Sequence, residues 1–140
     1  MHPTRRHRYA LAALAAIGCA ACSQQVDIAT TQCDLNRGPC TFTLDNGESG
    51  RIALSPRPLP LMKPIAIGIE APVRTARLDF QGTTMDMGFN QATLRRDDQG
   101  RLSGSALLPV CATGAMRWRV DLYLDDSPTA TARFEFDTGR

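Results

Sequence analysis

Four sulfur-bearing side chains in the second half of the chain could bind a soft metal ion. Met85 and Met87 lie two residues apart, and Cys111 and Met116 follow with a spacing of five. Thioether and thiolate sulfur favour Cu(I) over harder ions. If Met85 and Met87 share a strand, they project from the same face of the sheet. Methionines also fill irregular cores, so the spacing fits either a Cu(I) site or core packing.

Other common catalytic and metal-binding groups are scarce. His2 and His7 are the only histidines, and both lie in the predicted leader described below. A mature chain without imidazole has no histidine base, no Ser-His-Asp triad and no histidine metal ligand. The single lysine, Lys63, lies in a proline-rich segment that is a poor place for a buried catalytic amine. The sequence therefore predicts a binding protein and not an enzyme.

Residues 1–22 have the pattern of an export signal with a lipobox. Arg5, Arg6 and Arg8 precede an apolar run that is too short to span a bilayer, and small residues then lead into Cys19. Cys19 is the preferred lipidation site and Cys22 the second, while ordinary cleavage near Ala21 is the alternative. We expect a lipid-anchored protein of the cell envelope that faces the periplasm, at the outer membrane.

Removal of this leader changes the charge of the chain. It takes away three arginines and no acid, so the formal net charge falls from +2 to −1. No basic footprint for nucleic acid remains. Residues 23–32 are small and polar and are expected to form a tether. Residues 33–140 have the length of one domain with a modest core.

Apolar residues alternate with polar ones from residue 40 onward, and no segment holds a helical period. The clearest strand is 116–124, and after the turn at 125–128 the alternation repeats to residue 136, which predicts a C-terminal hairpin. The proline-rich segment 56–64 cannot form a central strand. We expect an all-β domain, an immunoglobulin-like antiparallel β-sandwich of seven to eight strands. The residues expected to face its core are Cys40, Phe42, Leu44, Ile52, Leu54, Ile65, Ile67, Ile69, Ala76, Leu78, Phe80, Leu102, Ala106, Leu108, Val110, Met116, Trp118, Val120, Leu122, Leu124, Ala130, Ala132, Phe134 and Phe136.

Three cysteines beyond the leader are disulfide candidates, because export places them in an oxidising compartment. Cys33 and Cys40 bracket a short loop rich in turn residues, so a local bridge is one prediction. A bridge from Cys111 to Cys33 or Cys40 is the other. One sequence does not decide the connectivity.

Several segments resemble small bacterial envelope proteins related to the FixH and YtkA-like β-sandwich domains. They are CDLNRGPC, PRPLPLMKPIAIGIE, MDMGFNQATL and GSALLPVCATGAMRWRVDLYL, within residues 33–137. The resemblance implies a periplasm-facing module linked to copper handling or cytochrome oxidase maturation, with copper chaperones or oxidase-assembly proteins as partners. The sites that carry over are Met85, Met87, Cys111 and Met116. A structural or protein-interaction lipoprotein without metal is the alternative.

Overall fold

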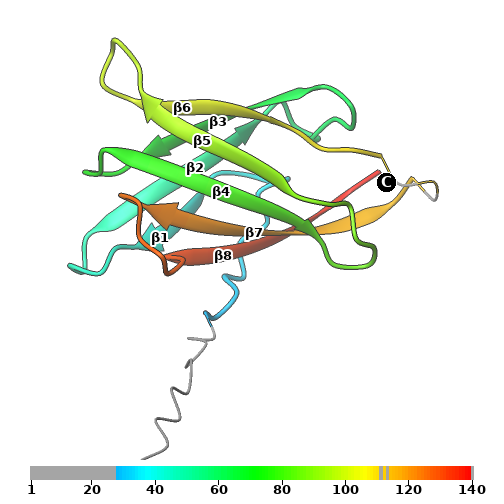
Figure 1. The fold of residues 1–140 in the computed structure, drawn as a ribbon, viewed down its shortest axis with the longest axis horizontal. Coiled ribbons are helices and arrows are strands. Elements are labelled where there is room, and N and C mark those ends of the chain that lie inside the picture. Colours follow the sequence, from blue (N-terminus) through cyan, green and yellow to red (C-terminus); the bar gives the residue numbers. More distant parts are fainter. Residues whose placement is uncertain (1–27, 111, 113, 140) are drawn as a thin grey trace, which may run out of the picture.

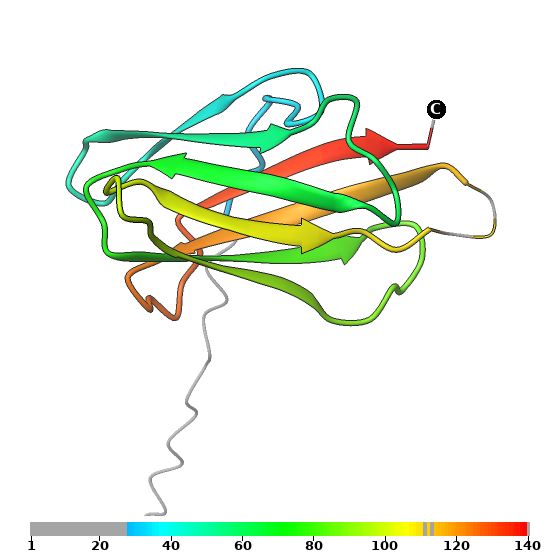
Figure 2. The ribbon, with the colours of Figure 1, turned by 90° about the horizontal axis from the view of Figure 1, so that it is seen from above.

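The computed structural model describes residues 28–139 except 111 and 113, and in these residues it contains eight antiparallel strands and no helix. The strands follow one another in the order β1-β2-β3-β6-β5-β4-β7-β8 and wrap into one nearly closed, barrel-like sheet (Figures 1 and 2). The prediction of an all-β domain with seven to eight strands is confirmed. The strands are β1 (Cys40–Thr43), β2 (Ser49–Ser55), β3 (Pro64–Glu70), β4 (Thr75–Gly82), β5 (Asn90–Arg96), β6 (Leu102–Leu107), β7 (Met116–Leu124) and β8 (Ala132–Thr138).

Alternation places one row of each strand inside the sheet. In β7 and β8 the buried rows meet across a ladder in which Trp118 lies opposite Phe136, and Val120 lies opposite Phe134. All four side chains are buried. The Trp118 indole also donates a hydrogen bond of 3.1 Å to the Thr138 hydroxyl, so its polar atom is satisfied inside the core. The predicted C-terminal hairpin is therefore confirmed.

The fold has two different ends. The loops 56–63, 83–89 and 108–115 and the C-terminus gather at one of them, on the right of Figure 1, and we call it the loop end. The four connections 44–48, 71–74, 97–101 and 125–131 gather at the opposite end, the turn end. This arrangement follows because each strand runs in the opposite direction to the strand before it, so that successive connections alternate between the two ends.

The seam between the outer strands β1 and β8 is covered by residues 28–39, which we call the seam segment. Thr30 forms a parallel bridge with Arg133 of β8. Leu35 is completely buried in the core. The Asn36 amide donates to the Asp137 carbonyl at 2.8 Å and accepts from the Leu59 N–H at 2.7 Å. The seam segment therefore joins β8 to the loop 56–63 and fills the place where the sheet does not close.

Some expectations about single segments are wrong. Val110 was expected in the core but lies in the loop 108–115 and is about half exposed (49%). It follows Pro109, and β6 already ends at Leu107, so the alternation that holds in the strand does not continue past it. Residues 56–63 form a loop, as expected for the proline-rich segment. The expectation is wrong for Pro64, which is the first residue of β3, a strand that pairs with both β2 and β6; a strand's first position tolerates proline.

Candidate functional site

Met85 and Met87 lie at the loop end, in the loop 83–89 between β4 and β5. The expectation that they share one face of a strand is therefore wrong. β4 ends at Gly82, and β5 starts only at Asn90. Met85 is about half exposed, whereas Met87 is half-buried and packs against the core. The two side chains thus differ in exposure because a loop, unlike a strand, does not impose one direction on alternate residues.

Atoms of three methionines surround Gly82, the last residue of β4. A Cβ at this position would collide with the Met116 Cε and the Met85 carbonyl oxygen, and it would lie 3.1 Å from the Met87 Cγ. The Met116 methyl group and the Met87 Cγ therefore both lie close to Gly82, whereas Met85 approaches it through its backbone carbonyl. Met116 comes from the first position of β7 and is buried. We call Met85, Met87 and Met116 the methionine cluster.

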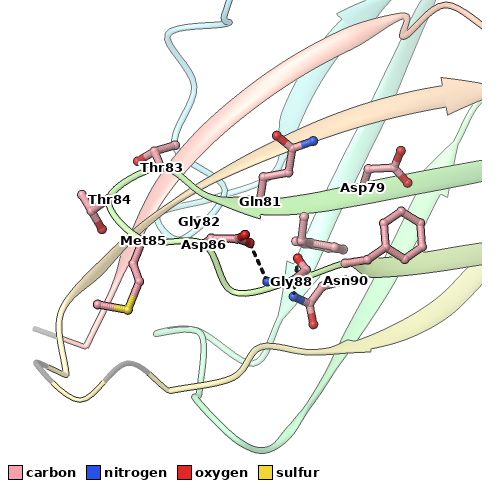
Figure 3. A pocket seen from close by; sticks show the side chains of 11 residues that line it. Asp79, Gln81, Gly82, Thr83, Thr84, Met85, Asp86, Gly88 and Asn90 are labelled. Atoms are coloured by element: carbon pink, nitrogen blue, oxygen red, sulfur yellow. Dashed lines mark hydrogen bonds between the residues drawn. The ribbon is translucent and has the colours of Figure 1, made fainter.

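The loop 83–89 is fixed by its own polar groups (Figure 3). The Asp86 carboxylate accepts a 2.8 Å hydrogen bond from the Gly88 N–H, a short turn typical of aspartate. The Asn90 amide donates to the Met87 carbonyl at 3.1 Å. Gly88 has a φ of +71°, which favours glycine at this place. At its other end the loop is joined to β7, because the Thr83 N–H donates to the Arg117 carbonyl at 2.9 Å. These contacts hold Met85 and Met87 near β7.

An open hollow of about 610 Å³ lies beside this loop, lined on one side by β4 and on the other by residues 83–86 and 88–90 (Figure 3). Asp79 and Gln81 supply polar atoms from β4. Phe89 lies at its edge and is 80% exposed, the most exposed large apolar side chain among the described residues. The alternation of apolar and polar residues did not predict that Phe89 would be exposed.

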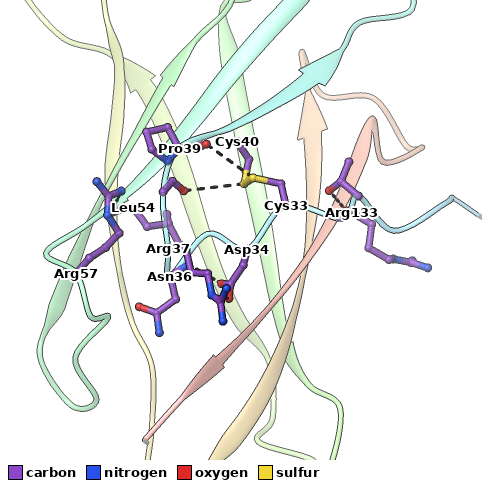
Figure 4. Close-up of a disulfide and its surroundings, with 11 residues drawn as sticks. Cys33, Asp34, Asn36, Arg37, Pro39, Cys40, Leu54, Arg57 and Arg133 are labelled. Atoms are coloured by element: carbon purple, nitrogen blue, oxygen red, sulfur yellow. Dashed lines mark hydrogen bonds and ion pairs between the residues drawn. A yellow bond between two sulfur atoms is a disulfide. The ribbon is translucent and has the colours of Figure 1, made fainter.

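The structure joins Cys33 to Cys40 by a disulfide that closes the loop within the seam segment (Figure 4). Of the two alternatives from the sequence, it therefore contains the local bridge. Cys111, the third disulfide candidate and a candidate metal ligand, lies outside the described residues. The two lipidation candidates, Cys19 and Cys22, also lie outside them, as does the leader 1–22.

Two aspartates at the turn end have structural partners. Asp97 accepts hydrogen bonds from the backbone N–H groups of Arg101 and Gln99 and from the Arg101 guanidinium. The bond from the Arg101 N–H is the largest cause that lowers the pKa of Asp97 below its usual value. Asp125 accepts from the N–H groups of Arg74 and Thr75. Both aspartates hold turn-end connections in place.

Within the described part of the chain, no three side chains of the types His, Cys, Asp or Glu come together as a metal-binding group. The same residues contain no apolar helix long enough to cross a membrane. No family model matches the chain, and neither a curated protein nor a solved structure matches it.

Proposed function

We propose that this protein is a binding module of the bacterial cell envelope that holds Cu(I) through thioether sulfur at the loop end. The observation that carries the proposal is that the Met116 methyl group and the Met87 Cγ both lie near Gly82, with the Met85 backbone carbonyl beside them. Residues separated by about thirty positions in the sequence thereby approach the same glycine. Thioethers are soft, uncharged donors, which suits Cu(I) better than Cu(II) or Zn(II).

The burial of the three side chains supports a site that is shielded but reachable. Met116 is buried, Met87 is half-buried and Met85 is about half exposed. An ion could therefore enter from the Met85 side and be held by the two inner side chains. Two or three thioethers alone hold copper weakly, and a thiolate would add charge and affinity. Cys111 is the proposed thiolate, because it lies five residues before Met116 and is not part of the Cys33–Cys40 disulfide.

The cellular setting is part of the same proposal. The lipobox at Cys19, or Cys22, would anchor the chain to the outer membrane with the domain in the periplasm. Of the expected tether 23–32, residues 28–32 belong to the seam segment, so only the residues before Ile28 would serve as a tether. Copper chaperones or oxidase-assembly proteins would be its partners, as the resemblance to FixH and YtkA-like domains implies. No catalytic role is proposed, because the chain beyond residue 7 has no histidine and Lys63 lies exposed in a loop.

The strand pairing supports an immunoglobulin-like arrangement within the nearly closed sheet. β3 pairs with β6, β4 pairs with β7, and β7 pairs with β8. Pairings of this kind link strands B with E, C with F and F with G in immunoglobulin-like domains. β5 and β6 share only two ladder positions, so they form the corner at which two layers join.

A Cu(I) titration against a chromogenic competitor tests the proposal. The test variant is Met85→Leu/Met87→Leu/Met116→Leu, in which leucine keeps the volume at a cost of less than about 1.5 kcal/mol per site. The matched control is Met62→Leu, which changes the fourth methionine beyond the leader, in the loop 56–63. We expect the control to bind like the wild type and the triple variant to lose at least about tenfold in affinity, an effect of about 1.4 kcal/mol.

Two further measurements distinguish the contribution of the Cys111 thiolate from that of the methionine thioethers and test the preference for Cu(I). Cys111→Ser should weaken Cu(I) binding while the methionines still bind, and Zn(II) should compete poorly with Cu(I) in the wild type. Circular dichroism confirms that each variant keeps its strands. Equal copper uptake by the wild type and the triple variant would show that the methionine cluster is only core packing, and the interaction lipoprotein without metal would then be the better proposal.

A further inference from the structure

Exposed large apolar side chains are concentrated at the loop end. The described residues include five of them, and they come from the three loops at this end and from the last residue of β6. Phe89 is 80% exposed, and the other four are about half exposed; the set is Met62, Met85, Phe89, Leu107 and Val110. The connections of the turn end carry none. Single exposed apolar residues are ordinary on a protein surface, but their collection at one end marks an interaction site.

Charge is distributed in the opposite way. The turn-end connections contain six acids and two cations, namely Asp45, Glu48, Asp97, Asp98, Asp125, Asp126, Arg74 and Arg101. The three loops of the loop end contain one acid, Asp86, and two cations, Arg57 and Lys63. Lys63 directly follows the exposed Met62. Asp34, Arg37 and Asp137 lie beside the loop 56–63 at the same end. The loop end is thus apolar and close to neutral, whereas the turn end is acidic, so only the loop end can approach an apolar surface with negative charge without net repulsion.

A bilayer with anionic headgroups has this chemistry. Apolar side chains enter the boundary between headgroups and acyl chains, while neighbouring lysine and arginine side chains meet the lipid phosphates. Insertion needs no matching shape, so it suits side chains that protrude from separate loops. A protein partner would need a packed and complementary surface around the same residues.

The length of the tether allows this contact with the membrane that holds the predicted anchor. The Ile28 carbonyl accepts a hydrogen bond from Arg133 at the start of β8, which is the turn end of the fold. A strand of nine residues such as β7 extends about 30 Å from there to the loop end. The nine Cα–Cα steps from Cys19 to Ile28 can also span about 30 Å when the chain is fully extended. A chain anchored at Cys19 can therefore turn its loop end toward the bilayer.

We propose that the loop end inserts Phe89 and its apolar neighbours into the surface of an anionic bilayer, as a second membrane contact besides the lipid anchor. The contact requires neither copper nor the methionine cluster as a metal site. Insertion holds the domain with the acidic turn end away from the phosphates. It also places the loop 83–89 at the membrane surface.

The test uses tryptophan as a depth reporter in the anchored full-length protein. Phe89→Trp places the reporter at the loop end, and Gln99→Trp places it in the exposed turn 97–101 as the matched control. Each variant is reconstituted without copper in vesicles of phosphatidylglycerol and brominated phosphatidylcholine. The buried Trp118 gives the same background in both and is subtracted with the wild type. We expect quenching of the loop-end reporter to exceed that of the control by at least about twofold, with a blue-shifted emission.

A charge-reversal variant and the concentration dependence separate membrane insertion from self-association. Lys63→Glu reverses the exposed cation beside Met62, and it should reduce quenching of the loop-end reporter in anionic vesicles. Equal quenching of the two reporters, or none, would overturn the proposal. A blue shift that grows with protein concentration without quenching would mean that a second copy covers the loop end, and this too would overturn it. Because copper is absent, the result does not depend on the fate of the proposed Cu(I) site.

Discussion

Arg133 and Asp121 form a two-contact ion pair across the β7–β8 ladder, with Arg133 Nε 2.7 Å from Asp121 Oδ1 and Arg133 Nη2 3.1 Å from Oδ2. Asp121 is buried although it was not among the residues expected to face the core and alternates along β7 with them, on the same side as Arg117 and Arg119. Arg133 also donates to the Ile28 carbonyl, and its own carbonyl accepts from Thr31. The pair therefore connects the hairpin to the seam segment.

Loss of one partner of this pair should be costly. Arg133→Met leaves the buried Asp121 carboxylate without its cation, and we expect a destabilisation of about 3 to 5 kcal/mol. The double variant Asp121→Leu/Arg133→Met removes both charges and should recover most of that loss. Arg117→Met is the control, because its contacts with Glu135 and Asp137 are exposed and worth about 1 kcal/mol or less. Denaturant unfolding measures the free energy of unfolding of all three variants. A double variant as unstable as Arg133→Met would contradict the prediction.

The Cys33–Cys40 bridge should stabilise the domain by restricting the unfolded chain. For a sequence separation of seven, the loop-entropy estimate is about 2 to 3 kcal/mol. We expect Cys33→Ser/Cys40→Ser to lower the free energy of unfolding by this amount. Leu35→Ala, within the same loop, should cost about 2 to 5 kcal/mol through the cavity it leaves in the core.

Peptide mapping under non-reducing conditions checks the connectivity on which this prediction depends. A peptide that links Cys33 to Cys40 is expected. A peptide that links Cys111 to either of them would contradict the structure, and the serine variant would then report on a different bridge.

Gly82→Ala should disturb the methionine cluster directly. The added methyl group meets the Met116 Cε and the Met85 carbonyl oxygen, and a backbone atom cannot move aside as easily as a flexible side chain. We expect a destabilisation of about 1 to 3 kcal/mol from overpacking. Gly68→Ala in β3 is the matched control, since its Cβ would meet no atom within 4 Å. Thermal unfolding gives the midpoint temperatures of the two variants. Equal midpoints would show that the methionine cluster accommodates the methyl group without loss of stability.

The pH dependence of stability should contain a contribution from Asp97. Its pKa in the folded protein is lowered, chiefly by the hydrogen bond from the Arg101 N–H. The stabilisation is therefore complete above the ordinary aspartate pKa and is lost as the pH falls through the lower folded value. Asp97→Asn should remove this part of the acid dependence. Unfolding curves of both proteins between neutral and acidic pH measure it, and parallel curves would argue against the prediction.

Strand alternation predicted most of the fold because it is a local property. Trp118, Phe134 and Ile67 were placed in the core from their sequence neighbours alone, and all are buried. The burial of Leu35 was not predicted, because it depends on the seam segment lying across the gap between β1 and β8. No local pattern contains that contact. Asp121 was missed for a similar reason, since its partner Arg133 lies on another strand.

The arrangement of the methionines could not be predicted from the sequence. Met87 and Met116 both approach Gly82 because this residue has no side chain and because the loop 83–89 turns at Gly88. The alternate spacing of Met85 and Met87 looks the same in a strand and in a short loop, so it did not reveal that β4 ends at Gly82.

The bridge between Thr30 and Arg133 joins the first and the last described segments of the domain. During synthesis the seam segment is made before all eight strands, and its partner strand β8 is made last. The hydrogen bond of Asn36 to Asp137 likewise forms only after β8 has been made. The seam segment thus cannot close the sheet until translation of the domain is complete. A chain that ends before β8 leaves Leu35 without its cover and the hydrogen-bonding edge of β7 unpaired. A protease or chaperone that recognises such exposed segments could distinguish an unfinished domain from a finished one.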